Sequence, residues 1–303
     1  MQHYFSNKPT GNPGFPADYY EKVLHYVQIL EGYAKLLDPD VDARTGASLA
    51  TVSEDSVFLY GDSASARAGI TAISQKLGLG RIALVGLGGT GSYILDLVAK
   101  TPVKEIHLFD GDDFGRHNAF RAPGAASLED LRASPKKVEY FRRMYSGFRT
   151  GIVAHPYFID EMNISELGSY DFVFVAVDNG PARGLVGRFL RDHAIPFIDV
   201  GMGLEKVAGE LSVRGGCRVT LCTPAMNQHF ELCVDTHDDR EEALYTSNIQ
   251  VSDFNAFNAA LAVGRWKQHL GFYSDSFGAH QIGYTVGLMS LSKDALDGRG
   301  HAD

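Results

Sequence analysis

The sequence is poor in cysteine and lacks any long apolar run. Its three cysteines, Cys217, Cys222 and Cys233, cannot all pair within one chain. No apolar stretch approaches the roughly 20 residues that a membrane-spanning helix requires, and the first ten residues lack the basic and then apolar pattern of a secretory signal. We therefore expect a soluble protein of the reducing cytoplasm, with no membrane partner.

Positive charge is also scarce. The chain has 28 lysine and arginine residues against 37 aspartate and glutamate residues, which gives a net charge of -9. This balance disfavours binding to nucleic acid or to an anionic membrane, although it leaves room for a local positive pocket. Hydrophobic residues make up 45% of the chain, which is enough for the core of one large domain, alone or with an extension.

The spacing of potential zinc ligands does not match a zinc site. Cys217 and Cys222 are spaced C-x-x-x-x-C, Cys233 stands apart, and the 11 histidines form no cluster with ligand spacing. We expect no structural zinc.

Turn residues and apolar periodicity divide the chain into three parts. Glycine and proline interrupt the first fifteen residues, and apolar residues then recur at helical spacing over residues 19–37, so residues 1–62 are predicted to be an arm and a helical extension. From residue 63 to residue 291, β-rich runs alternate with helical segments after an initial helix that ends at Gly78. Residues 292–303 are predicted to be a flexible tail.

The alternation predicts an α/β fold: a Rossmann-like, mainly parallel sheet with helices on both faces and an antiparallel continuation. The helix that we expect Asp253 to cap has more apolar positions than one face requires, which favours core or dimer packing and leaves open whether Asn255 and Asn258 line a pocket rim. The predicted strands are residues 82–85, 105–109, 152–155, 172–177 and 196–200, followed by the antiparallel strands 209–213 and 218–222.

A glycine-rich turn stands where the first strand is predicted to feed into a helix. Gly86, Gly88 and Gly91 form G-x-G-x-x-G, and residues 92–100 that follow have a helical pattern. Glycine lets the backbone approach a phosphate closely, and the helix N-terminus offers free N–H groups. Asp110 ends the next strand, where its carboxylate can accept hydrogen bonds from ribose hydroxyls. The pattern predicts a nucleotide site.

Polar side chains beyond Asp110 distinguish two kinds of nucleotide chemistry. Asp112, Asn118 and Arg121 follow it closely, and Lys137 stands at the start of a predicted helix. Hydride transfer leaves the pyrophosphate of its cofactor intact and does not need this set. AMP transfer does, because a carboxylate attacks an α-phosphate while negative charge accumulates on the departing pyrophosphate. Cationic side chains and magnesium usually stabilise that charge.

Taken in order, these motifs resemble those of the ThiF/MoeB superfamily, an adenylating fold shared with ubiquitin-activating enzymes. The resemblance covers about residues 63–266. It rests on five ordered motifs, which are G-L-G-G-T-G at 86–91, D-G-D at 110–112, Asn118 with Arg121, K-K-V-E at 136–139, and Asp178-Asn179 with Arg183.

The resemblance implies ATP and magnesium as cofactors and gives each residue a role. Asp110 would hold the ribose, and Asp178 would bind magnesium near the reacting α-phosphate. Arg121, Lys137 and Asp178 would be the catalytic residues. The implied nucleotide-binding set is Gly86, Gly88, Gly89, Gly91, Asp110, Asp112, Asn118, Arg121, Lys137, Asp178 and Asn179.

The resemblance further implies a reaction and two partners. The substrate would be the C-terminus of a ubiquitin-like or sulfur-carrier protein, converted to an acyl-adenylate with release of pyrophosphate. Arg67 is similar to an arginine that reaches into the neighbouring subunit's site in this family, which implies a homodimer. Two alternatives stay open: a Rossmann oxidoreductase that uses NAD or FAD, and a non-catalytic nucleotide-binding scaffold.

Relatives of the ubiquitin-activating type also form a thioester on a cysteine. Cys233 lies in a comparable region and Cys222 is a second candidate, but acidic neighbours of Cys233 such as Glu231 and Asp235 would raise the pKa of its thiol. We therefore expect the reaction to stop at the acyl-adenylate.

Overall fold

A single sheet of eight strands organises the chain in the computed structural model, which describes residues 18–39, 41, 56–62, 65, 68–237 and 249–295. The strand order is β3-β2-β1-β4-β5-β6-β7-β8. The first five strands in that order are parallel, and β6, β7 and β8 continue the sheet in antiparallel pairing. The strands are β1 (Arg81–Val85), β2 (Glu105–Phe109), β3 (Ile152–His155), β4 (Phe172–Val175), β5 (Phe197–Lys206), β6 (Val213–Cys222), β7 (Gln281–Thr285) and β8 (Ser290–Asp294).

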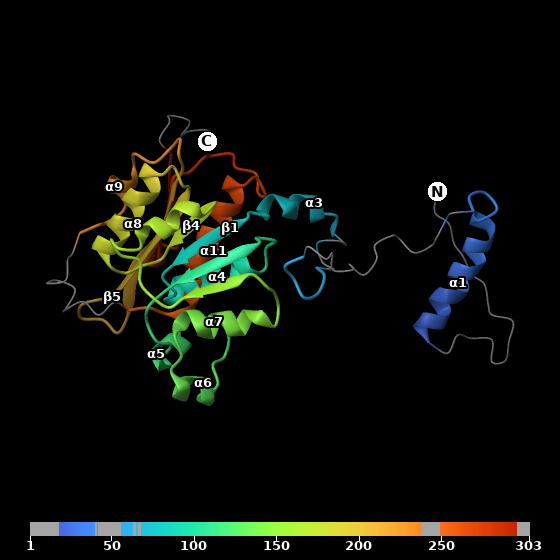
Figure 1. Cartoon of the computed structure of the whole chain (residues 1–303), viewed down its shortest axis with the longest axis horizontal. Helices are drawn as coiled ribbons and strands as arrows, with labels where there is room; N and C mark the ends of the chain where they lie inside the picture. Colours follow the sequence, from blue (N-terminus) through green and yellow to red (C-terminus); the bar gives the residue numbers. More distant parts are fainter. Residues whose placement is uncertain are drawn as a thin grey trace.

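Helices cover both faces of the sheet (Figure 1). Alternate residues of β1 face opposite layers, since Ile82 and Leu84 belong to one core and Ala83 and Val85 to the other. The first core includes residues of α4, α7 and α11, and the second includes residues of α8, α9 and η2. The helices are α1 (Tyr19–Ala34), α3 (Thr71–Ser74), η1 (Gln75–Leu77), α4 (Gly89–Ala99), α5 (Arg116–Ala119), α6 (Leu128–Ala133), α7 (Lys137–Ser146), η2 (Ile164–Ser169), α8 (Gly180–Asp192), α9 (Phe230–Cys233), α11 (Ser252–His269) and η3 (Val286–Leu288).

The predicted fold class is therefore confirmed, including the antiparallel continuation. The N-terminal helix is also present as α1, and Asp18 caps it by accepting a hydrogen bond from the backbone N–H of Glu21 at 2.8 Å. None of its sixteen residues is buried, and Figure 1 shows α1 apart from the sheet. In the described part of the chain, no helix combines the length and apolar character needed to cross a membrane.

Several predicted limits were wrong around the antiparallel part of the sheet. Strand β4 ends at Val175, whereas β5 continues to Lys206 because β6 pairs with it over all ten residues. Of the strand predicted over residues 209–213, only Val213 belongs to a strand, since residues 207–212 connect β5 to β6. The chain predicted to fray from Ser292 forms the second half of β8 up to Asp294 and pairs with β7. Residues 296–303 lie outside the described part.

Two helix predictions also need correction. α11 begins at Ser252 after Val251, with no side-chain cap, so Asp253 lies in the first turn rather than at the cap. The helix predicted from residue 63 includes a residue with left-handed backbone, Gly69, whose φ is +68°. Ser65 and Ala68 are helical before this glycine, and regular helix continues after it in α3 and η1.

Candidate functional site

A cavity of about 600 Å³ opens at the carboxyl ends of β1, β2 and β4, next to β5. Strand order reverses at β1, which has β2 on one side and β4 on the other. Ligands of open α/β sheets bind in the crevice outside the strand ends at this point. Nine of the predicted nucleotide residues line the cavity, namely Gly86, Gly88, Gly89, Asp110, Asp112, Arg121, Lys137, Asp178 and Asn179.

The glycine-rich turn joins β1 to α4 and leaves the first turn of α4 free of side-chain caps. Gly86 has a φ of +93°, which a residue with a side chain rarely adopts. Gly91 lies outside the cavity lining, and a Cβ there would approach the Gly86 carbonyl oxygen within 2.0 Å. Gly91 therefore permits the close packing of turn and helix, whereas the backbone at Gly88 has open space in front of it.

Asp110 fixes the turn as well as facing the cavity. Its carboxylate accepts hydrogen bonds from the backbone N–H of Leu87 at 2.7 Å and of Asp112 at 2.9 Å. Only 4% of Asp110 is exposed. One oxygen of this buried carboxylate lies 3.5 Å from the Lys137 ammonium, so the residue links the end of β2 to both the glycine turn and the start of α7.

Lys137 and Arg121 bring positive charge to the cavity. Lys137 donates to Asp112 at 2.6 Å, and its side chain is only 7% exposed. The Arg121 Nε is buried and has no hydrogen-bond partner among the described residues. Burial lowers the pKa of His117, and the charges of Arg121 and Lys137 lower it further. A group of anionic oxygens would satisfy these cations.

Asn118 has a different position from the predicted triphosphate contact. It is not among the residues that line the cavity. Its side-chain oxygen accepts a hydrogen bond from the backbone N–H of Gly115 at 2.9 Å, which closes the single turn of α5. The backbone N–H of Arg121 in turn bonds to the Asn118 carbonyl oxygen at 3.1 Å. Asn118 thus shapes the segment that presents Arg121.

Asp178 and Asn179 close the opposite wall, between β4 and α8. Asp178 is exposed, and Asn179 caps α8 by accepting from the backbone N–H of Ala182 at 2.9 Å. Arg183 donates to the carbonyl oxygen of Val177, the residue before Asp178, at 2.5 Å.

The residue that holds Arg183 was not predicted from the sequence. Asp199 on β5 is fully buried and pairs with the Nε of Arg183 at 3.1 Å and with Arg218 at 2.7 Å. Burial raises the pKa of the Asp199 carboxyl, and the two guanidiniums oppose that rise. A carboxylate in the middle of an apolar strand was the available signal, because such a charge requires a partner.

α11 places one amide at the cavity wall and a second against the glycine turn. Asn255 accepts from the Thr90 hydroxyl at 3.1 Å, beneath the glycine turn. Asn258 lines the cavity and donates to the Gly201 carbonyl oxygen at 3.2 Å. The buried side-chain oxygens of Asn258 and of Gln250, which also lines the cavity, have no partner within the described part of the chain. The sequence left open whether Asn255 and Asn258 line a pocket, and Asn258 is the one that does.

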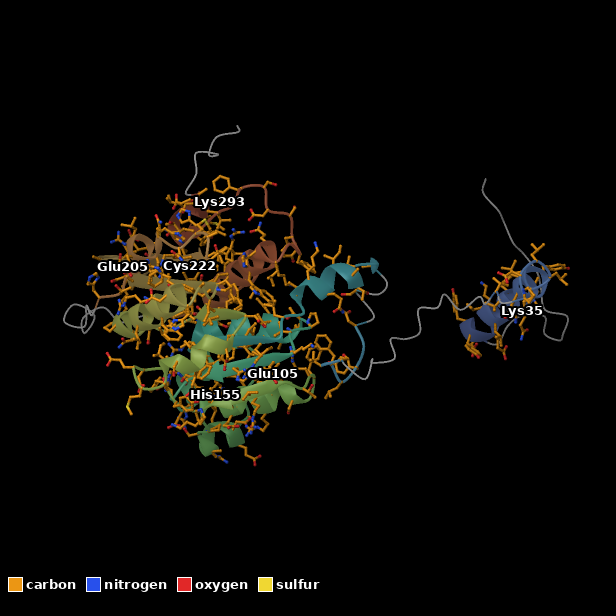
Figure 2. All side chains as sticks on the ribbon, turned by 45° about the horizontal axis from the view of Figure 1, so that its top comes forward. Lys35, Glu105, His155, Glu205, Cys222 and Lys293 are labelled. Carbon is orange, nitrogen blue, oxygen red and sulfur yellow. The ribbon has the colours of Figure 1, made fainter. Side chains whose placement is uncertain are left out.

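The three cysteines are free, and none lines the cavity. Burial raises the pKa of the Cys217 and Cys222 thiols to about 12. Burial also raises the pKa of Cys233, and here Arg218 opposes the rise. Loss of hydration is thus the main cause, rather than the acidic neighbours noted in the sequence. Cys222 lies inside the sheet domain (Figure 2). Arg67, proposed to reach a second subunit, lies outside the described residues.

Two family models match the chain. A model of the ThiF family matches residues 62–291, and a model of a domain of unknown function, DUF6791, matches residues 1–63. Ubiquitin-like modifier-activating enzyme 5 of Culex quinquefasciatus is 25% identical over 156 residues, which cover 48% of this chain and 39% of that protein. The SUMO-activating enzyme subunit uba-2 of Caenorhabditis elegans is 26% identical over 134 residues, or 43% and 22% of the two chains. The chain therefore spans well under half the length of these relatives.

Solved structures show the same fold at low identity. E. coli MccB with ATP superposes with a TM-score of 0.59 and 19% identity, over 73% of this chain and 65% of that one. PaaA superposes with a TM-score of 0.55 and 17% identity, over 75% and 76% of the two chains. The matched family model covers the whole sheet up to the start of β8 and every described residue of the cavity. The chain belongs to the ThiF family.

Proposed function

We propose that the chain is an ATP-dependent adenylyltransferase that activates the C-terminal carboxylate of a ubiquitin-like or sulfur-carrier protein. One substrate oxygen forms a bond to the α-phosphorus of ATP, the bond between the α-phosphorus and the bridging oxygen to the β-phosphate breaks, and pyrophosphate leaves with its negative charge. The products are an acyl-adenylate and pyrophosphate, and no net proton transfer is needed. The proposal depends mainly on one observation, namely that a single cavity combines the glycine turn, the Asp110 carboxylate and two cationic side chains.

The nucleotide would lie across the strand ends. Asp110 has the position to accept from ribose hydroxyls, and the free N–H groups at the start of α4 suit phosphate oxygens. Phe158 and Ile159 line the same cavity and offer an apolar wall to the base. Arg121 and Lys137 would hold the triphosphate and stabilise the charge that develops on pyrophosphate.

Asp178 fits a magnesium ion that arrives with ATP. Its carboxylate is exposed at the cavity wall, and magnesium is bound through one or two carboxylates together with substrate phosphates. Groups of three or more histidine, cysteine, aspartate and glutamate side chains suited to a metal do not occur among the described residues, so phosphate and water oxygens would complete the coordination. When bound, the ion would neutralise part of the phosphate charge.

The wall at β5 and α11 suits the acyl substrate. The unpartnered oxygens of Asn258 and Gln250 can accept hydrogen bonds, and peptide N–H groups are suitable donors. Hydrogen bonding to Gly201 fixes the orientation of the Asn258 amide, because reversal would set two oxygens against each other. The relatives named for ubiquitin-like modifiers and SUMO support a protein C-terminus as the substrate.

The first test is calorimetric titration of the chain with ATP, AMP and NAD in parallel. We expect ATP to bind and NAD not to bind. Asp110→Ala should weaken ATP binding by about 1–3 kcal/mol, because it removes the ribose acceptor and frees the N–H of Leu87. Asp113→Ala is the matched control, since Asp113 pairs with Lys136 at the surface. Tight NAD binding, or equal effects of the two substitutions, would contradict the proposal.

The second test asks whether the reaction stops at the acyl-adenylate. Thioester formation requires a thiol that is partly ionised near neutral pH, and burial raises the pKa of all three thiols. We expect a variant with Cys217→Ala, Cys222→Ala and Cys233→Ser to retain substrate-dependent exchange of pyrophosphate into ATP. A thiol-sensitive adduct between this chain and a ubiquitin-like protein, lost in Cys233→Ser, would show that the reaction goes further.

We also propose that the chain forms a homodimer and lies in the cytoplasm. Free cysteines suit a reducing compartment.

A further inference from the structure

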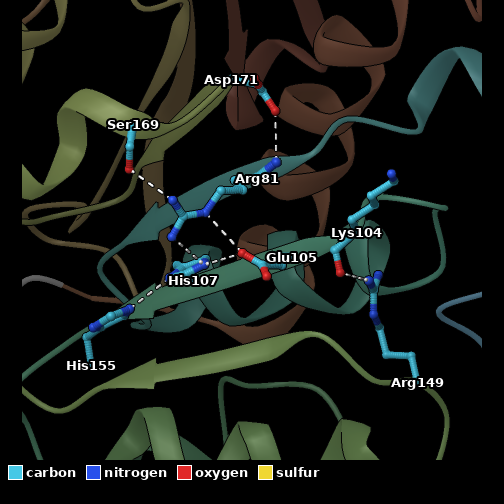
Figure 3. Close-up of polar contacts among 8 residues, drawn as sticks. All are labelled: Arg81, Lys104, Glu105, His107, Arg149, His155, Ser169 and Asp171. Carbon is cyan, nitrogen blue, oxygen red and sulfur yellow. Dashed lines mark hydrogen bonds and ion pairs between the residues drawn. The ribbon is translucent and has the colours of Figure 1, made fainter.

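Five polar side chains form a continuous hydrogen-bonded row that runs from β2 across β3 to η2, which we call the histidine network (Figure 3 shows its first three members). Glu105 contacts the Nε2 of His107 at 3.2 Å. The Nδ1 of His107 lies 2.9 Å from the Nε2 of His155, and the Nδ1 of His155 lies 3.0 Å from the Tyr157 hydroxyl. Tyr157 in turn donates to Glu166 at 2.8 Å.

The histidine network contacts residues that line the proposed nucleotide cavity. The His155 ring stacks on Phe109 with 4.2 Å between ring centroids, and Phe109 lines the cavity. Tyr157 precedes Phe158 and Ile159, which line the same cavity. The ring of Phe158 lies so close to Gly111 that a Cβ on that glycine would approach it within 2.7 Å. Tyr157 therefore connects the network to the proposed wall for the base.

Counting protons shows how the network responds to pH. It has four contacts, each of which needs one proton, but two neutral imidazoles and one phenol supply only three. Arg81 suits the form with three protons. It bonds to Glu105 at 3.0 Å and lies 3.5 Å from the Nε2 of His107, so it can act as the donor when this nitrogen carries no proton. One further proton on His107 completes all four contacts. A second would place N–H groups of His107 and His155 face to face at 2.9 Å.

Several neighbouring groups shift the pKa values of the two histidines. Burial lowers the pKa of both His107 and His155, and Arg81 on β1 lowers them further. Glu105 raises the pKa of His107, and Glu166 raises that of His155. The Tyr170 ring contacts His107 edge-on, and burial raises the pKa of Tyr170 to about 12, so the phenol stays neutral.

We propose that the histidine network positions the cavity wall formed by Phe109 and Phe158, and that a second proton on the His107–His155 pair releases this wall. His107, His155 and Tyr157 are then positioning residues, since none of the three lines the cavity. The inference rests on the proposed function in one respect, namely that the cavity holds ATP. Because the folded-state pKa values are lowered, the stabilisation is present above the ordinary histidine pKa of about 6.5 and is lost as the pH falls further.

The test measures ATP affinity of the full chain between about pH 5 and 7.5, a range that extends below the ordinary histidine pKa because the pKa values of both histidines are lowered. Wild type should keep its affinity while the first proton completes the contacts, and should then lose it as the second proton adds, by up to about tenfold per pH unit beyond the loss caused by titration of ATP itself. His107→Gln should lose much less, because its single remaining imidazole can be protonated without losing a contact. His193→Gln is the matched control, since His193 is an exposed histidine on the end of α8 and should follow wild type. Equal pH dependence in wild type and His107→Gln would overturn the inference.

Tyr157→Phe provides a second variant that leaves both histidines in place. It cuts the connection to the wall, so we expect weaker ATP binding near pH 7.5 and a reduced dependence on pH. Hydrogen exchange of residues 156–163 tests the positioning without ATP: protection should fall on acidification in wild type and not in His107→Gln, after correction for intrinsic rates. Absence of ATP binding at every pH would reject the proposed function, whereas the exchange result would still decide the inference. Unchanged protection of this segment in wild type would overturn it.

Discussion

Replacing Asp178 by asparagine should abolish most turnover while leaving ATP affinity within a few-fold of wild type. The proposed magnesium ion acts mainly on charge that develops as pyrophosphate leaves, so its carboxylate contributes more to the transition state than to the bound ground state. Removing one preorganised electrostatic contact of this kind costs about 10²–10³ in rate. Pyrophosphate exchange, with a panel of peptides that end in a free carboxylate, measures the rate, and calorimetry measures the affinity.

Asp171→Asn is the matched control for this prediction. Asp171 precedes β4 and Asp178 follows it, so the two substitutions remove the same charge at opposite ends of one strand. Asp171 accepts from the backbone N–H of Arg81 at 2.8 Å, which an asparagine oxygen can also do. The control should retain full exchange activity. Equal losses of ATP affinity and rate in Asp178→Asn would give Asp178 a structural role instead.

The glycine turn could be predicted from the sequence because its signals are local. A glycine at φ +93° and a carboxylate at the end of the next strand are each encoded within a few residues. Gly86 and Asp110, which are both predicted to bind the nucleotide, line the cavity. The bond from Leu87 to Asp110 was not predictable in detail, but it follows from the same strand-end arrangement.

Features that depend on long-range register could not be read in this way. The His107–His155 contact exists because β2 and β3 are parallel neighbours, with Phe109 opposite His155. The sequence separates the two histidines by 48 positions, and no local pattern pairs them. Asn118 was misplaced for a related reason, because its motif position does not show that its side chain bonds back to Gly115.

The length of β5 also depended on its partner. Glycines at 201, 203 and 209 suggested an early end to the strand. Pairing with β6 overrides that signal up to Lys206, and at Gly201 a Cβ would meet the Arg218 guanidinium at 2.9 Å. This glycine therefore makes room for the arginine that pairs with Asp199, which is a packing requirement invisible to turn propensity.

Replacing Asp199 by asparagine should lower the free energy of unfolding more than any other substitution named above. The substitution keeps the shape of the side chain but leaves Arg183 and Arg218 without their shared counter-charge, and its amide group faces guanidinium donors on one side. Breaking a buried ion pair by removing one partner costs about 3–5 kcal/mol. Because Arg183 also holds the Val177 carbonyl beside Asp178, activity should fall as well. Denaturant unfolding measures the loss of stability.

Glu205→Gln on the same hairpin is the matched control for Asp199→Asn. Glu205 and Asp199 both lie on β5, and each bonds to an arginine of β6 at 2.7 Å. The two pairs differ in exposure, since the side chains of Glu205 and Arg214 are 52% and 66% exposed whereas Asp199 is fully buried. Water screens the exposed pair, so its loss should cost less than about 1 kcal/mol. Similar costs for the two substitutions would mean that the strand pairing, rather than the buried charge, stabilises this part of the site.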